Sequence, residues 1–244
     1  MVGSVDSGGN RDLAHPGHGQ SNASTVEARS YFQRCLREIT NIDERVKGRF
    51  DLRAASVSDK LLGLSLITPL LLQTAPCVTK SASDTFLTQF KAMAATTFFT
   101  QVMKMATARN RPYTYSADPC IQRYTKARGT GAAASFYSNH ASATFASAVI
   151  GASLFSALNS GANLRPLVWG AQTALAAMAS NLRVIAGQHF YSDVLAGAFA
   201  GVVCGVAMSM IDGSDQLAMV ANSGDVIGIV GGLLLGTALS NYVS

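Results

Sequence analysis

The chain has 244 residues, enough for one domain with an appendage. Apolar residues make up 48% of it but charged residues only 14%, against about 25% in an ordinary soluble domain, so much of the chain must be buried in protein or lipid. The net charge of +5 favours anionic partners such as phosphate groups or acidic headgroups, and the lack of a basic run interleaved with aromatics argues against nucleic acid.

The chain begins with a polar segment followed by a charged one. Residues 1–24 are rich in Gly, Ser and Asn, and we predict a disordered tail without a secretory signal. Residues 25–60 are amphipathic and predict one or two helices that lie on a surface. The four cysteines form no CxxC pair and no metal-ligand spacing, so we expect neither a disulfide framework nor a zinc site. The sequence also has no acidic cluster that would bind a metal, and we expect no cofactor.

Residues 61–244 form the main domain and contain six long stretches with little or no charge. Each is close to the ~20 residues that a helix needs to cross a bilayer. Ala and Gly dominate, without the period-two alternation of strands. The sequence therefore predicts an all-α fold, a bundle of about six apolar helices at roughly 61–79, 86–103, 141–159, 166–182, 194–211 and 226–243.

The shortage of charge favours a bundle that is embedded in a membrane. Stretches such as ATFASAVIGASLFSALN are rich in Ala and Ser, which also suits tightly packed helices in a soluble bundle. The sequence therefore fits a membrane-embedded bundle and also a soluble one.

Three polar islands interrupt the apolar stretches, the first at residues 104–112. Lys104 and Arg111 are seven residues apart, so they share one face if the helix continues. Pro112 biases Arg111 away from helical dihedrals and ends the helix. Taken alone, the two cations also fit snorkelling side chains at a helix end.

The second island covers residues 136–142 and opens a long Ala-rich helix. Ser138 and Asn139 are good N-cap residues, and His140 follows them directly. The backbone N–H groups of such a helix start favour an anion. Taken alone, the segment also fits a simple cap with a solvated histidine.

The third island covers residues 183–193, between two apolar stretches. His189 and Asp193 are four residues apart, and a carboxylate at that distance can fix the imidazole tautomer and make the other ring nitrogen a better nucleophile or base. Arg183 opens the island. Asp193 alone also fits a helix cap.

The order of the islands predicts that they meet. If the apolar stretches cross a membrane, an even number of crossings separates the islands, so all three fall on the same side. They would there bring together three cations, two histidines, a serine at a helix start and one aspartate.

The pattern KxxxxxxRP, then Ser-x-His at a helix start, then RxxxxxHxxxD resembles the type-2 phosphatidic acid phosphatase superfamily, which also contains bacterial non-specific acid phosphatases and vanadium haloperoxidases. The order and internal spacings match across residues 104–193. Tyr137 and Asn139 depart from the usual Pro and Gly of the second motif, and Leu182 from the usual Ser of the third. Because Asn tolerates glycine-like dihedrals, we expect the loop to keep its shape.

The resemblance implies a metal-independent phosphatase. His189 would be the nucleophile that forms a phosphohistidine, Asp193 would orient it through its far ring nitrogen, and His140 would be the general acid and then the general base. The phosphate-binding residues would be Lys104, Arg111, Ser138, Asn139 and Arg183.

Apolar segments beside cationic islands predict a phosphorylated lipid or other phosphate ester as substrate, with the membrane as partner. The alternatives are a soluble non-specific acid phosphatase, a vanadate-dependent haloperoxidase, and a non-catalytic membrane binding protein of the same fold. The resemblance places the motifs of a multi-pass membrane protein on the extracytoplasmic side, whereas the positive-inside rule favours the cytoplasmic side.

Overall fold

A computed structural model describes residues 41–72, 82–158, 163–211 and 223–243 of the chain. These ranges contain helices and no strand, as the all-α prediction requires. Six long helices form a bundle: α3 (Leu52–Leu71), α4 (Ala82–Thr107), α6 (Asn139–Leu158), α7 (Arg165–Ile185), α8 (Tyr191–Ile211) and α9 (Ser223–Val243). Short elements join them or precede them: α2 (Asn41–Glu44), η2 (Pro112–Tyr115), α5 (Pro119–Arg128) and η3 (Gly129–Ala133).

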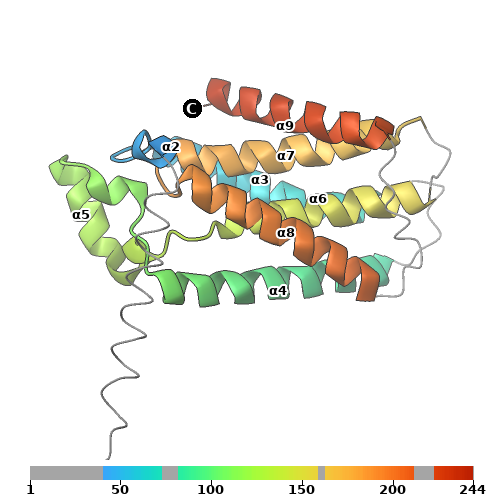
Figure 1. Ribbon diagram of the computed structural model, residues 1–244, viewed down its shortest axis with the longest axis horizontal. Coiled ribbons are helices and arrows are strands. Elements are labelled where there is room, and N and C mark those ends of the chain that lie inside the picture. The colour runs from blue at the N-terminus through green and yellow to red at the C-terminus, as the bar shows by residue number, and fades with distance from the viewer. Residues whose placement is uncertain (1–40, 73–81, 159–162, 212–222, 244) are drawn as a thin grey trace, which may run out of the picture.

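The helices α6 and α7 lie at the centre of the bundle. The helix α6 packs on α3, α4, α7 and α8, while α9 packs on α7. In Figure 1, α9 lies along one side of the bundle and α4 along the opposite side. The short elements α2 and α5 lie together at one end, where α4 and α7 finish and where α6 and α8 begin. The polar islands are therefore gathered at this end, which we call the site end.

The helix α3 begins earlier than the apolar stretch at 61–79. Asp51 has an extended backbone, and its carboxylate accepts the N–H groups of Arg53 and Ala54, so it caps the helix. The first turns of α3 therefore lie within the segment 25–60 that we predicted to be amphipathic. Residues 25–40 of that segment, like the predicted tail, fall outside the described residues.

Small residues bring the helices into close contact. A Cβ atom on Gly201 of α8 would lie 2.2 Å from the backbone oxygen of Ser142 on α6. A Cβ atom on Gly232 of α9 would lie 2.2 Å from the backbone oxygen of Gly170 on α7. Both glycines belong to stripes of spacing four, Gly197, Gly201 and Gly205 on α8 and Gly228, Gly232 and Gly236 on α9. Such stripes allow helix backbones to approach closely.

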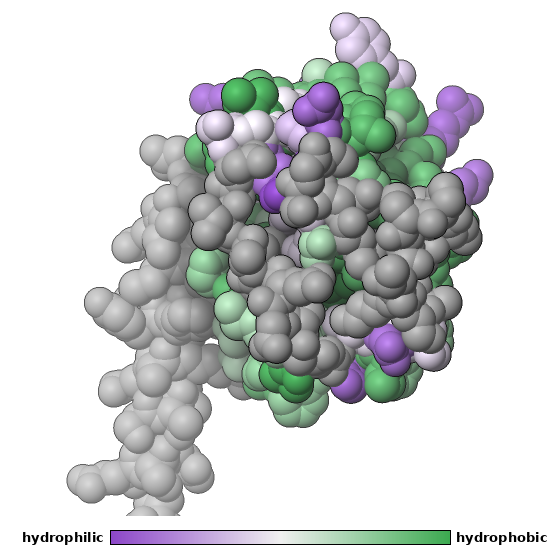
Figure 2. Space-filling model, turned by 90° about the vertical axis from the view of Figure 1, so that its right-hand side faces the viewer, coloured by the Kyte–Doolittle hydropathy of each residue, from purple (hydrophilic) through white to green (hydrophobic). Residues whose placement is uncertain are grey.

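The bundle has small and hydroxylated side chains inside and large apolar side chains outside. The buried positions are mostly Ala, Ser, Thr and Gly, whereas exposed positions include Phe98 and Phe99 of α4, Phe199 of α8 and Leu234 of α9. Figure 2 looks at the end opposite the site end and shows apolar surface along its rims. Within the described part of the chain, three helices, α3, α8 and α9, are long and apolar enough to cross a membrane. This distribution is compatible with a membrane location.

Candidate active site

Arg111 of the first motif makes hydrogen bonds to two other loops of the site. The helix α4 ends at Thr107, and Arg111 has an extended backbone (φ −77°, ψ 154°) before Pro112. Its Nε donates to the backbone oxygen of Gly131 at 3.0 Å, and its Nη1 donates to Oε1 of Gln188 at 2.8 Å. Arg111 thus fastens the loop before the second motif to the loop that carries the third.

The expectation that Lys104 and Arg111 share a helix face required α4 to continue beyond residue 104 by two turns. It does not, because the chain turns at Ala108, which has a positive φ of 43°. Lys104 lies in the last turn of α4, and Arg111 lies on the following loop. The loop, rather than helical periodicity, brings the two cations to the same end.

The second motif forms the start of α6, as predicted. Ser138 precedes the first helical residue, Asn139, and the hydroxyl oxygen of Ser138 accepts the N–H of Ala141 at 3.4 Å. The N–H of Ser138 donates to the backbone oxygen of Asp193 at 3.0 Å, which ties this helix start to that of α8. Asn139 is not among the residues with positive φ in the described ranges. The position therefore has no need of glycine, and asparagine introduces no backbone strain there.

His189, the nucleophile expected in the third motif, is held through Nδ1. The side chain is 2% exposed, and Nδ1 lies 2.7 Å from the backbone oxygen of Ser135. Because a carbonyl oxygen can only accept, Nδ1 carries the proton in this contact. The neutral ring therefore has its lone pair on Nε2, the nitrogen that would attack phosphorus.

Asp193 lies close to the ring of His189 and is joined to it through Ser135. Its Oδ2 lies 3.8 Å from Nδ1 of His189, too far for a hydrogen bond. The same oxygen accepts the Ser135 hydroxyl at 2.5 Å and the N–H of Phe190 at 2.9 Å. Asp193 thus lies within ion-pair distance of the ring at the nitrogen that the resemblance implied, and a relay adds to this contact: Asp193 holds Ser135, and the backbone of Ser135 holds the ring. Through the bond to Phe190, Asp193, the third residue of α8, also accepts the N–H of the residue that precedes the helix.

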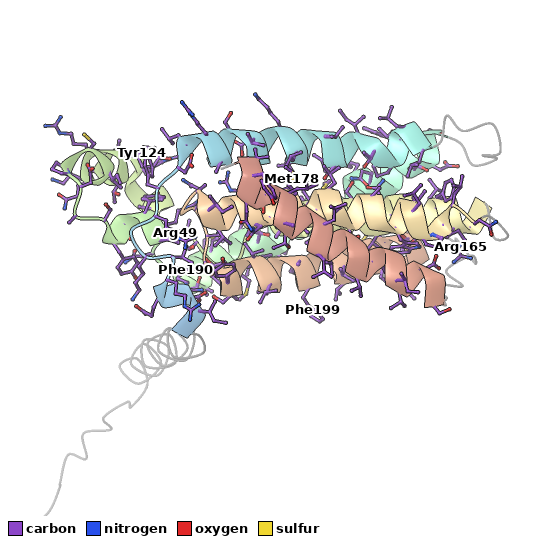
Figure 3. The ribbon with its side chains drawn as sticks, turned by 90° about the horizontal axis from the view of Figure 1, so that it is seen from above. Arg49, Tyr124, Arg165, Met178, Phe190 and Phe199 are labelled. Carbon is purple, nitrogen blue, oxygen red and sulfur yellow. The ribbon has the colours of Figure 1, made fainter. Side chains whose placement is uncertain are left out.

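Arg109, which sequence analysis did not single out, pairs with Asp193. One guanidinium nitrogen donates to Oδ1 of Asp193 at 2.5 Å, and the other donates to Oδ2 of Asp43 on α2 at 2.8 Å. The guanidinium also lies over the ring of Phe190, 4.2 Å from its centroid. Figure 3 shows Phe190 at the site end together with Arg49 and Tyr124, and Arg165 at the opposite end.

His140 and Arg183 share a carboxylate that sequence analysis also missed. Nε2 of His140 lies 2.7 Å from Oδ1 of Asp59 on α3, and Nη1 of Arg183 donates to the same oxygen at 3.0 Å. Nε of Arg183 is buried without a hydrogen-bond partner in the part of the chain that the structure describes. A buried donor of this kind is costly unless a ligand satisfies it.

The match to known families covers these motifs. A family model, the PAP2 superfamily, matches residues 86–214, which is more than half of the chain. The chain belongs to the PAP2 superfamily. Membership implies phosphatase-type hydrolysis of a phosphoric ester. No curated protein and no solved structure matches the chain.

Of the residues that sequence analysis missed, two lie inside the range that matches the PAP2 family and two lie before it. Arg109 and Ser135 lie inside the matched range, close to the motifs, and their polar character in an apolar chain was the only signal. Asp43 and Asp59 lie before it, in the segment that we predicted to be a charged surface region. Only the packing of α2 and α3 against the motifs reveals their contacts.

The electrostatics of the PAP2 site keep His189 neutral. Burial, helped by the positive charges of Arg111 and Arg183 and opposed by the Asp193 carboxylate, lowers the pKa of His189 to about 3. Burial also lowers the pKa of Arg111 from its usual value. A neutral imidazole within reach of two guanidinium groups suits attack on an anion. In the described ranges, no three His, Cys, Asp or Glu side chains are grouped so that they could hold a metal ion.

Proposed function

We propose that this PAP2 protein is a metal-independent phosphatase that works through a phosphohistidine at His189. The observation that carries the proposal is the contact between Nδ1 of His189 and the backbone oxygen of Ser135. This contact fixes the tautomer whose Nε2 has a free lone pair, and burial keeps the ring neutral over the whole range of ordinary assay pH.

The chemistry then runs in two steps. Nε2 of His189 attacks phosphorus, the bond between phosphorus and the ester oxygen breaks, and His140 gives a proton to the leaving oxygen. Water next gives a proton to His140 and attacks the phosphohistidine, so the P–N bond breaks and inorganic phosphate leaves. Asp193 holds Ser135 and the start of α8 in both steps.

Phosphate binding is assigned to the cationic side chains of the site end. Lys104, Arg111 and Arg183 would neutralise the phosphoryl oxygens as charge redistributes in the transition state. The free Nε of Arg183 supports this role, because a guanidinium can hold Asp59 and a phosphate oxygen together. The Ser138 hydroxyl and the N–H of Asn139 would complete the cradle at the start of α6. Fixed cations would thus supply the charge that Mg²⁺ supplies in many phosphoryl-transfer enzymes.

The proposed substrate is a lipid phosphate or lipid diphosphate. The support is the apolar exterior of the bundle, which lies directly beside the cationic site end. A bilayer around the helices would hold acyl or prenyl chains there and present the phosphate to the site. A multi-pass membrane protein is therefore the proposed form of the molecule.

A substrate panel with chelator tests this proposal. Phosphatidic acid, phosphatidylglycerol phosphate, a polyprenyl diphosphate and a soluble phosphomonoester are each assayed for phosphate release in detergent with EDTA. We expect turnover of at least one lipid, with loss of activity in His189→Ala. A need for added Mg²⁺, or full activity in His189→Ala, would contradict the mechanism, and hydrolysis of the soluble ester alone would contradict the lipid substrate.

The orientation in the membrane can be measured through Cys120. The extracytoplasmic orientation is proposed from the family, while the exposed cations of the site end favour the cytoplasmic side under the positive-inside rule: Arg45, Lys47, Arg49, Arg123, Lys126 and Arg128. Cys120 is exposed on α5 at the site end. With the other three cysteines replaced by serine, a membrane-impermeant maleimide should label Cys120 on intact cells if the site is extracytoplasmic. Labelling only after lysis would place the site in the cytoplasm.

A further inference from the structure

Asp59 lies at the rim of the site and contacts one of its buried cations. It lies on α3, two turns after the helix begins, and outside the range that matches the family. Its side chain is 61% exposed, yet its Oδ1 contacts the Arg183 guanidinium, whose side chain is only 10% exposed. The carboxylate therefore reaches from the rim of the site toward its buried part.

One oxygen of Asp59 serves two groups of the proposed mechanism. It lies 2.7 Å from Nε2 of His140 and 3.0 Å from Nη1 of Arg183. An ionised carboxylate can only accept hydrogen bonds, so Nε2 of His140 carries a proton in this contact. The other ring nitrogen, Nδ1, is then the one that can exchange a proton with the leaving oxygen and with water.

We propose that Asp59 is a positioning residue for the phosphatase reaction, which holds the ring of His140 in the orientation of a general acid and links it to Arg183. The inference rests on the proposed function. Burial and the charge of Arg183 lower the pKa of His140 to about 4, and the Asp59 carboxylate opposes them. The carboxylate therefore favours the protonated ring that an acid needs at the start of the first step, and it keeps the proton on Nε2 when the ring then acts as a base.

The contact between Asp59 and Arg183 fixes the position of His140 relative to the bound phosphate. A guanidinium has five N–H donors, and Nη1 supplies the one that binds Asp59. Nε of Arg183 has no partner among the described residues, so it stays available for a phosphoryl oxygen. Asp59 can therefore remain in place when phosphate binds, and its link to Arg183 sets where His140 stands relative to the leaving oxygen.

The test compares two leaving groups in Asp59→Asn. A p-nitrophenolate leaves readily without a proton, whereas an alkoxide needs one, so a damaged general acid harms alkyl phosphates selectively. For a short-chain alkyl phosphate we expect kcat/KM, which reports the first step alone, to fall about 10²-fold, and for p-nitrophenyl phosphate less than about 3-fold. His140→Ala should show the same selectivity, and the double variant should lose little more than His140→Ala alone, because both residues act as one unit.

Control variants separate this role from a merely structural one. Glu44→Gln removes an exposed carboxylate of the same end, which pairs with Lys47 on the surface, and should leave both rates unchanged. Asp59→Glu keeps a carboxylate and should recover part of the alkyl phosphate activity. Because Asp59 is mostly exposed, Asp59→Asn is expected to fold.

Two results would overturn the proposal. Equal losses for both leaving groups would mean that Asp59 has no part in proton transfer. An undiminished kcat/KM together with tighter inhibition by inorganic vanadate would mean that the carboxylate only competes with phosphate for Arg183. Failure of the proposed function would look different, since His189→Ala would then keep the activity of the unaltered protein whatever the result at Asp59.

Discussion

The backbone oxygen of Ser135 lies 2.7 Å from Nδ1 of His189, and the hydroxyl of Ser135 donates to Asp193 at 2.5 Å. One residue thus stands between the expected nucleophile and the carboxylate expected to orient it. The arrangement fixes the imidazole by a main-chain atom, which no side-chain substitution removes. The carboxylate fixes the position of that main-chain atom.

Ser135→Ala should reveal this relay. The backbone acceptor for His189 stays, but Asp193 loses one of its buried donors, so we expect the free energy of unfolding to fall by about 1–3 kcal/mol. We also expect kcat to fall about 10-fold, because the ring is held less firmly. Ser147→Ala is the control, since Ser147 is also buried and bonds to Ser65 away from the motifs. It should lower stability without lowering kcat, and a loss of kcat in both variants would argue against the relay.

Arg109→Gln should affect both stability and catalysis. Removal of the guanidinium leaves the buried carboxylates of Asp43 and Asp193 without their cation, which costs about 3–5 kcal/mol in comparable buried pairs. Thermal unfolding measures the loss of stability, and steady-state kinetics measure the loss of kcat.

A buried ion pair at the other end provides the matched control. The side chain of Arg165 is 14% exposed and pairs with Asp225 at 2.6 Å, while that of Arg109 is 12% exposed. Arg165→Gln should therefore destabilise the bundle to a similar degree and leave kcat unchanged in the folded fraction. Equal loss of kcat in the two variants would mean that the Arg109 effect is only one of stability.

The low pKa of His189 predicts how stability depends on pH. The unfolded chain binds a proton at this residue below its ordinary pKa near 6.5, whereas the folded chain does so only below about 3. The free energy of unfolding should therefore fall as the pH is lowered from about 6.5 toward 3, and the slope should be smaller in His189→Asn. The ring resonances of His189 should not shift between pH 8 and about 5. A midpoint near 6.5 would show that the ring is not buried as described.

Two adjacent glycines of α9 test how the helices pack. A Cβ atom on Gly231 would meet nothing within 4 Å, whereas one on Gly232 would lie 2.2 Å from the backbone oxygen of Gly170. Gly232→Ala should force α9 away from α7 and cost about 1–3 kcal/mol. Gly231→Ala should be neutral or stabilise the protein by up to about 1 kcal/mol, through helix propensity. Equal effects would contradict the close approach of α9 to α7.

Much of the bundle follows from the sequence. The charge-free stretches predicted the six long helices, because a helix that buries or exposes apolar surface on all sides needs no charged face. The order of the polar islands also predicted their place at one end, since α4, α6, α7 and α8 run in alternate directions. The start of α6 at Asn139 was predicted from capping chemistry alone.

Contacts between distant segments could not be predicted in this way. Asp43 and Asp59 are ordinary carboxylates in a charged segment, and their roles depend on where α2 and α3 pack. The place of Ser135 between His189 and Asp193 depends on the path of a loop, which carries no periodic signal. The same limit explains why Lys104 and Arg111 were expected on one helical face, although α4 ends at Thr107.

The phosphohistidine is the most direct test of the central claim. The enzyme is mixed with substrate in the presence of EDTA, turnover is stopped at alkaline pH, where phosphohistidine survives, and peptides are examined by mass spectrometry. We expect one phosphoryl group on the peptide that contains His189 and none in His189→Asn. With p-nitrophenyl phosphate, whose leaving group needs no acid, we expect a larger amount in His140→Ala, where the second step lacks its base. Continued turnover without a phosphoryl group on His189 would contradict the account.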